Sequence, residues 1–143
     1  MDISSERLTS AEKDPRTRLA FEKALTEYNQ GRLISAEAKC LEIIKKDPKH
    51  FDAVQMLGII AYQNRKLDIA VVFFAKAVGI EPENARAQYN LGRAFLEYGK
   101  LEEAEICYRK ALQIEPRYAE ALNDLGQVVL LLGSTDEAER NYQ

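Results

Sequence analysis

The chain has 143 residues, of which 46% are hydrophobic and 30% charged, and its formal net charge is −3. These values are ordinary for a globular domain, and the small, mixed charge argues against nucleic acid or a membrane surface as the partner. The polar segment 1–16 lacks the apolar core of a secretion signal, and the longest apolar run, 128–132, is far too short to span a membrane.

In chain order, apolar residues recur at intervals of three and four from residue 17 onward, a pattern typical of amphipathic helices, and no strand-like alternation competes with it. The pattern predicts about seven and a half helices. They cover 17–30, 33–46, 51–64, 67–80, 85–98, 101–114 and 119–132, and an eighth begins near Thr135 and stops with the chain.

Glycines are expected to end several of these helices, because glycine adopts the left-handed conformation without steric cost. Gly31, Gly99 and Gly133 occupy equivalent positions after the first helix of a pair. The second pair has Asn64 and Arg65 there. Asparagine tolerates this conformation next best, but it lies one residue early.

The sequence repeats every 34 residues. Prolines recur at 48, 82 and 116, alanines at 36, 70, 104 and 138, and Leu-Gly pairs at 57–58, 91–92 and 125–126. A fixed period of this length predicts stacked helix pairs. The expected units are 17–50, 51–84, 85–118 and a truncated 119–143.

Glycine in mid-helix is unfavourable, so its recurrence at Gly58, Gly92 and Gly126 predicts close approach of a neighbouring helix. The large residues in the matching second helices, Phe74, Tyr108 and Tyr142, are expected to fill the space beside them.

The third unit carries the fullest motif: Leu91-Gly92, Phe95, Ala104, Tyr108, Ala111 and Pro116. This pattern resembles the tetratricopeptide repeat (TPR), and the resemblance extends over 17–143. It implies an all-α, right-handed α-solenoid of about three and a half repeats. The first unit departs from the motif, since its first helix fits only if one residue before Gly31 is deleted.

A weaker resemblance concerns the opening unit together with 47–53 and Met56-Leu57-Gly58. These residues look like the repeat region that begins bacterial proteins carrying a sulfotransferase or O-GlcNAc-transferase-like domain.

The family resemblance implies that the first helix of each pair lines a concave groove that holds a peptide or a helix. The residues expected to line this groove are Met56, Ile59, Gln63, Arg86, Tyr89, Asn90, Arg93, Asn123, Asp124 and Gln127. Met56, Ile59 and Tyr89 could equally pack inside the stack. Phe21 and Leu25 are expected to pack, and the turn residue His50 is expected to be solvated.

Two binding modes of the family fit poorly. The carboxylate clamp needs Lys and Asn where this chain has Phe21 and Leu25, and Asn where it has Met56. The asparagine ladder would be reduced to Asn90 alone, with Glu22, Met56 and Asp124 in the other positions.

Two cysteines, Cys40 and Cys107, lie 67 residues apart, too far for a disulfide within a stack of repeats. Neither has a nearby histidine or cysteine at metal-ligand spacing, so no metal or cofactor is expected. Reduced thiols fit a cytoplasmic protein best.

The sequence therefore predicts a protein–protein interaction scaffold without catalysis. The alternative is the substrate-recognition or assembly region of a larger transferase, and a reading frame that continues past Gln143 would favour it. A nucleophile–base grouping and a phosphate-binding loop are both missing from the sequence. Self-association is expected through the uncapped C-terminal end, because 128–132 lose part of their cover.

Overall fold

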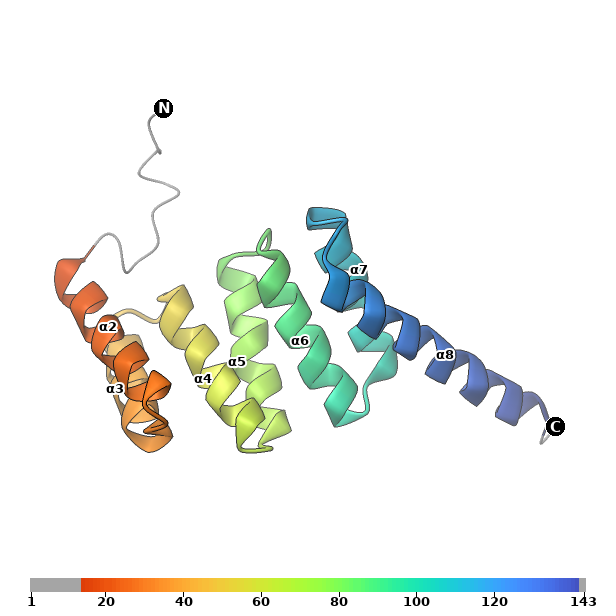
Figure 1. The fold of residues 1–143 in the computed structure, drawn as a ribbon, viewed down its shortest axis with the longest axis horizontal. Coiled ribbons are helices and arrows are strands. Elements are labelled where there is room, and N and C mark those ends of the chain that lie inside the picture. Colours follow the sequence, from red (N-terminus) through yellow and green to blue (C-terminus); the bar gives the residue numbers. More distant parts are fainter. Residues whose placement is uncertain (1–13, 142–143) are drawn as a thin grey trace, which may run out of the picture. The chain divides into compact units, whose positions relative to one another are not determined.

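The structure is a computed structural model and describes residues 14–141, which form helices and no strand. The helices are α2 (Pro15–Asn29), α3 (Leu33–Lys46), α4 (Phe51–Gln63), α5 (Leu67–Ile80), α6 (Ala85–Tyr98), α7 (Leu101–Ile114) and α8 (Ala119–Asn141). Figure 1 shows them in sequence order. The all-helical prediction is confirmed. Along this described stretch, no helix is both long enough and apolar enough to cross a membrane.

The chain divides into two compact units, one ending at Lys66 and the other beginning at Leu67. In the first unit α2 packs on α3 and α3 on α4. Its core is made of small and medium side chains, including Ala24, Ala36, Cys40 and Ile43, which allow the helices to approach closely.

The second unit continues the same arrangement: α5 packs on α6, α6 on α7 and α7 on α8. Ala104, Tyr108 and Val128 are buried at its centre. Tyr89, Phe95 and other partly buried apolar side chains of α6, α7 and α8 pack around them.

Three helices end in the same hydrogen-bonded turn. A residue with positive φ follows each of α2, α4 and α6, and the next amide donates to a carbonyl five residues earlier. The left-handed residues are Gly31, Arg65 and Gly99, with φ of 79°, 60° and 89°. The amide–carbonyl distances are 2.9 Å for Arg32 to Glu27, 2.9 Å for Lys66 to Ala61 and 2.8 Å for Lys100 to Phe95.

The roles of Gly31 and Gly99 are confirmed, whereas Asn64 does not adopt the left-handed conformation: its φ is −84°, and Arg65 adopts it instead. The repeat register therefore outweighs the local preference of asparagine. The turn demands a left-handed residue at this position, whichever side chain is there.

The N-termini of α4 and α6 are capped by residues 34 positions apart. The amide of Ala53 donates to Nδ1 of His50 at 3.1 Å, and the amide of Ala87 donates to Oδ1 of Asn84 at 3.0 Å. His50 has no exposed surface, and its ring centroid lies 5.5 Å from that of Phe21. The expectation that His50 is solvated is therefore wrong: it caps α4 from inside the core. The expected packing of Phe21 is confirmed, whereas Leu25 is 40% exposed, so its expected packing is wrong.

Helix α8 contradicts the predicted break at Gly133. It runs without interruption from Ala119 to Asn141, so residues from Thr135 onward extend α8 instead of forming an eighth helix. In the earlier pairs the second helix begins with a partly buried leucine, at 33, 67 and 101, and the equivalent residue here is Thr135. Its hydroxyl donates to the Leu131 carbonyl at 2.9 Å, as a continuing helix allows. A single glycine costs only about 1 kcal/mol and does not stop the helix unaided.

The mid-helix glycines Gly92 and Gly126 have different surroundings, because α8 continues straight past Gly133. A Cβ on Gly92 would meet the Tyr108 ring, which confirms the predicted close approach. A Cβ on Gly126 would have no neighbour within 4 Å, because residues 134–141 continue α8 instead of folding back onto it, so the prediction is wrong there. Tyr142, its expected partner, lies outside the described residues.

Candidate functional site

The predicted groove residues are distributed over both units. Within the second unit, the nominated residues lie on α6 and α8, two helices that contact each other. Arg86, Tyr89, Asn90 and Arg93 recur at intervals of three and four on α6, which places them on one face of that helix. Asn123, Asp124 and Gln127 belong to the facing helix α8. We call these seven residues together with Tyr118 the tyrosine face.

Tyr89 is at the centre of the tyrosine face. Its hydroxyl donates a hydrogen bond to Oδ2 of Asp124 at 3.0 Å, which joins α6 to α8. Its ring is half-buried, with centroids 5.8 Å from Tyr108 and 5.1 Å from Tyr118. Tyr108 belongs to the core, so Tyr89 links the core to the surface. Tyr89 also packs against the core cluster around Tyr108, as the packing alternative expects.

The electrostatic environment of Tyr89 keeps its hydroxyl protonated. Burial, the hydrogen bond to Asp124 and the negative charge of that carboxylate together raise the pKa of Tyr89 to about 12, while Arg93 acts in the opposite direction. Asp124 also accepts from the Asn123 amide, at 3.4 Å to Oδ1. The carboxylate is thus fixed by donors from both helices.

Two arginines border the aromatic rings. The guanidinium carbon of Arg93 lies 5.7 Å from the Tyr89 ring centroid, within the range of a cation–π contact. Burial raises the pKa of Tyr118, while the neighbouring Arg86 guanidinium lowers it. Both arginines are exposed. The face therefore combines cations, an aromatic surface and amide groups.

Sequence reasoning missed Tyr118. It lies in the turn before α8, 34 residues after Asn84 and 68 after His50, at the position that caps α4 and α6. An aromatic residue at a capping position was the available signal, because tyrosine seldom caps a helix. In the fourth repeat, this position places an aromatic ring on the tyrosine face instead of a helix cap.

The remaining nominated residues lie in the first unit. Met56 is only 5% exposed, and its sulfur lies 3.4 Å from Sγ of Cys40, which donates its S–H to it. Met56 thus takes the packing role that the sequence left open. Ile59 is half-buried, and the exposed Gln63 donates its amide to the Tyr28 hydroxyl at 2.6 Å. In the second unit, Asn90 is half-buried and Gln127 exposed.

The tyrosine face offers several kinds of group that a peptide could contact. Exposed guanidinium groups can hold carboxylates, amide side chains can pair with a peptide backbone, and the half-buried rings offer apolar contact. Residues 14–141 contain no group of three or more His, Cys, Asp or Glu side chains placed to hold a metal ion. Both cysteines are free and buried, and burial raises the pKa of Cys40 to about 12 and that of Cys107 to about 11.

Replacing Asp124 by asparagine is expected to lower the pKa of Tyr89 from about 12 towards the ordinary tyrosine value, because the charge that opposes tyrosinate formation is lost. Tyrosinate absorbance should then rise at a lower pH. The contribution of Tyr89 is the difference in tyrosinate absorbance between each protein and the same protein with Tyr89→Phe. Asn123→Ala, which leaves the carboxylate in place, should shift this titration much less. An unchanged titration in Asp124→Asn would contradict the described hydrogen bond.

Two protein-family models match the chain. The model described as TPR repeat matches residues 92–133, and the model described as tetratricopeptide repeat matches residues 61–109. The two matches overlap, and together they cover slightly more than half of the chain.

Solved structures of three proteins show the same fold. The first TPR of Spaghetti (RPAP3), bound to the HSP90 peptide SRMEEVD, is 24% identical with a TM-score of 0.78, over 82% of this chain and 93% of that one. MamA from Desulfovibrio magneticus RS-1 is 21% identical with a TM-score of 0.77, over 92% of this chain and 74% of that one. O-GlcNAc transferase from Thermobaculum terrenum is 21% identical with a TM-score of 0.74, over 85% of this chain and 23% of that protein.

Proposed function

This chain belongs to the tetratricopeptide repeat family, and from that premise we propose that it is a protein-binding module whose tyrosine face holds a peptide segment of a partner protein. The observation that supports this proposal most is the arrangement around Tyr89. A half-buried ring connects the core to the surface, and it contacts Arg93, Tyr118 and Asp124. Aromatic and arginine side chains are the residues that most often dominate binding energy at protein interfaces.

The similar domain of Spaghetti (RPAP3) is described in complex with a peptide, which supports a peptide as the class of ligand. The ligand need not be the same peptide. Phe21 and Leu25 replace the Lys and Asn that a carboxylate clamp requires, and Met56 is buried. We therefore infer that recognition depends on side chains within the peptide rather than on a terminal carboxylate alone.

Changing Tyr89, Asn90 and Arg93 together to alanine is expected to weaken peptide binding at least about tenfold, or by about 1.4 kcal/mol. The probes are peptides selected from a tiled array with the unaltered protein, and fluorescence anisotropy gives their dissociation constants. Circular dichroism should show nearly unchanged helicity.

The matched control changes three exposed apolar residues on α5 and α7, Ile69, Val72 and Ile106, to alanine, and binding should persist. The tyrosine face is not the ligand surface if binding survives the first triple substitution and is abolished by the second.

A second candidate function is the recognition or assembly region of a larger transferase. The similarity to a part of the Thermobaculum terrenum O-GlcNAc transferase favours it, since the matched region is 23% of that protein. Expression of the complete native gene and an assay for transfer of a sugar or sulfate to the array-selected peptides would test this. If the complete product has no transfer activity, the scaffold function stands alone.

We further propose that α8 carries a second interaction surface, through which the chain associates with other copies of itself. Val129, Leu130 and Leu131 are exposed on this helix, and clustered exposed apolar side chains often mark an interface.

A further inference from the structure

A cavity in the first unit lies outside every residue that the sequence nominated. It is a groove of about 740 Å³ between α2 and α3, and no residue of α4 lines it. Its apolar lining consists of Leu19, Ala20, Ala38 and Ile43. Two of these are alanines, and small side chains allow another helix to approach closely.

Cations border this groove on both sides. Arg16 and Lys23 come from α2, and Lys39 and Lys46 come from α3. Each pair is separated by seven residues, or two helical turns, and therefore by about 10.5 Å along its helix. The groove thus presents two parallel rows of positive charge beside an apolar floor.

The acidic residues of the groove are already engaged. Asp14 caps α2 by accepting from the Arg16 amide at 2.9 Å. Glu42 pairs with Lys45 at 3.2 Å, and Asp47 accepts from the Lys49 amide at 3.3 Å.

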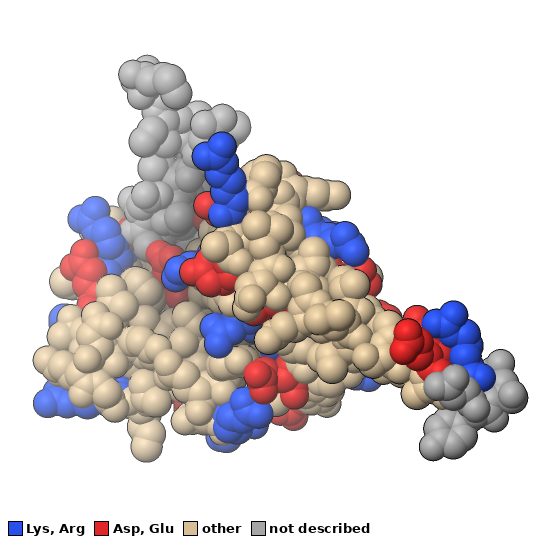
Figure 2. Space-filling view, turned by 45° about the vertical axis from the view of Figure 1, so that its right-hand side comes forward, with Lys and Arg blue, Asp and Glu red and all other residues tan. Residues whose placement is uncertain are grey.

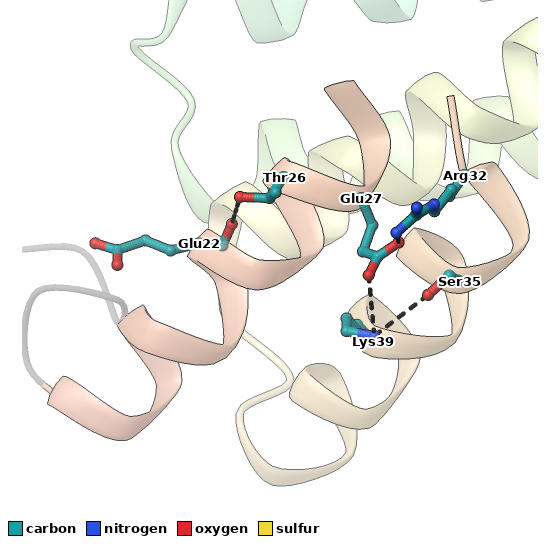
Figure 3. Close-up of polar contacts among 6 residues, drawn as sticks. All are labelled: Glu22, Thr26, Glu27, Arg32, Ser35 and Lys39. Atoms are coloured by element: carbon teal, nitrogen blue, oxygen red, sulfur yellow. Dashed lines mark hydrogen bonds and ion pairs between the residues drawn. The ribbon is translucent and has the colours of Figure 1, made fainter. Parts of the chain in front are cut away.

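Among the cations, Lys39 is held between Glu27 and Ser35, at 4.0 Å and 3.2 Å (Figure 3). Lys23 and Lys46 form no ion pair with any residue in 14–141. The groove therefore fits an apolar helix flanked by acidic side chains.

The distal part of α8 has this chemistry. Leu130 is 73% and Leu131 48% exposed, and residues 133–140 are exposed throughout. At 100° per residue, Leu130, Ser134, Ala138 and Leu131 share an arc of about 100°. Glu137 lies about 20° beyond Leu130, whereas Glu139 lies about 80° beyond Leu131. Figure 2 shows this helix extending as a largely uncharged surface with charged side chains near its end.

We propose that the distal part of α8 of one copy docks into the groove between α2 and α3 of a second copy. This inference rests on the proposed self-association through α8 and names its counterpart. The apolar residues of α8 lie on the apolar floor, Glu137 faces one row of cations, and Glu139, farther round the helix, lies towards the other row. The two surfaces differ, so the contact is heterologous and leaves one α8 and one groove open at the ends of the assembly. Assembly can therefore continue beyond a dimer.

Two variants of the 143-residue chain block the two surfaces separately. Leu130→Glu with Leu131→Glu blocks α8, and Lys23→Glu with Lys46→Glu blocks the groove. All four side chains are exposed, so folding should be retained, and circular dichroism verifies this. The matched control, Lys66→Glu with Lys110→Glu, reverses two exposed cations that do not line the groove.

Sedimentation velocity over a range of concentrations should show that the unaltered chain and the control associate beyond the dimer, while each blocked variant stays monomeric. An equimolar mixture of the two blocked variants should form a one-to-one heterodimer and nothing larger, because one intact α8 then meets one intact groove.

Each failure has a distinct meaning. If the groove variant associates as the unaltered chain does, or the mixture stays monomeric, the groove is not the counterpart of α8. In that case an α8–α8 pair or another acidic helix occupies these surfaces. If the unaltered chain is monomeric at every concentration, the proposed self-association fails as well.

Discussion

Replacement of His50 by alanine is expected to lower the free energy of unfolding by about 3 kcal/mol. Loss of the cap on α4 accounts for about 1 kcal/mol, because the Ala53 amide loses its acceptor. Loss of the fully buried ring leaves a cavity beside Phe21, which accounts for about 2 kcal/mol. Nε2 is buried without a hydrogen-bond partner, so packing and the cap hold the ring in place. Urea denaturation measures the change.

The matched variant is His50→Asn, which reproduces the cap that Asn84 forms on α6 in the next repeat. This variant should retain the cap and lose only the ring, so its destabilisation should be about 2 kcal/mol. Equal destabilisation by alanine and asparagine would show that the cap contributes nothing. A stability unchanged in both variants would contradict the buried position of His50.

Alanine substitutions at Gly92 and Gly126 are expected to change stability in opposite directions, although the two positions are equivalent in the repeat. A Cβ on Gly92 would lie 2.7 Å and 2.9 Å from the Cε1 and Cδ1 atoms of Tyr108. Tyr108 is fully buried, so its ring cannot move aside without disturbing the core, and Gly92→Ala should cost about 1–3 kcal/mol. At Gly126 the added methyl group meets nothing, and Gly126→Ala should stabilise by about 0.5–1 kcal/mol.

A double-mutant cycle isolates the cause at Gly92. If the clash with Tyr108 is responsible, Gly92→Ala should be less harmful in a Tyr108→Leu background, which removes the ring. Additive effects of the two substitutions would show that the clash with Tyr108 does not cause the destabilisation. Equal changes at Gly92 and Gly126 would indicate that helix propensity alone determines both.

The sequence allowed most helix boundaries to be predicted because the signals for them are local. Leucine at the start of each second helix, proline after its end and glycine in the turn are all visible in the 34-residue period. The exception is α8, where Thr135 replaces that leucine. Gly133 alone does not end α8, because the turn between two helices also needs a second helix that packs back onto the stack.

Parts of the candidate site could be predicted and parts could not. The positions on α6 and α8 follow from helical spacing, which brings Tyr89 and Asp124 to facing helices. Whether a side chain is buried depends on its three-dimensional neighbours, so the sequence could not distinguish the buried Met56 from the exposed Gln63. The same limit applies to His50, whose burial depends on Phe21. Tyr118 was overlooked because it lies in a turn, outside the helical pattern.

The uninterrupted course of α8 through Gly133 has a thermodynamic consequence. One continuous helix carries Asp124, which accepts from Tyr89, and Leu130, which belongs to the proposed docking surface. A peptide that displaces Asp124 would therefore act on the same rigid body that enters the groove of a second copy. Linkage makes any such effect reciprocal: if the peptide strengthens assembly by some factor, assembly strengthens peptide binding by the same factor. The affinity of the chain for its ligand would then depend on the concentration of the chain itself.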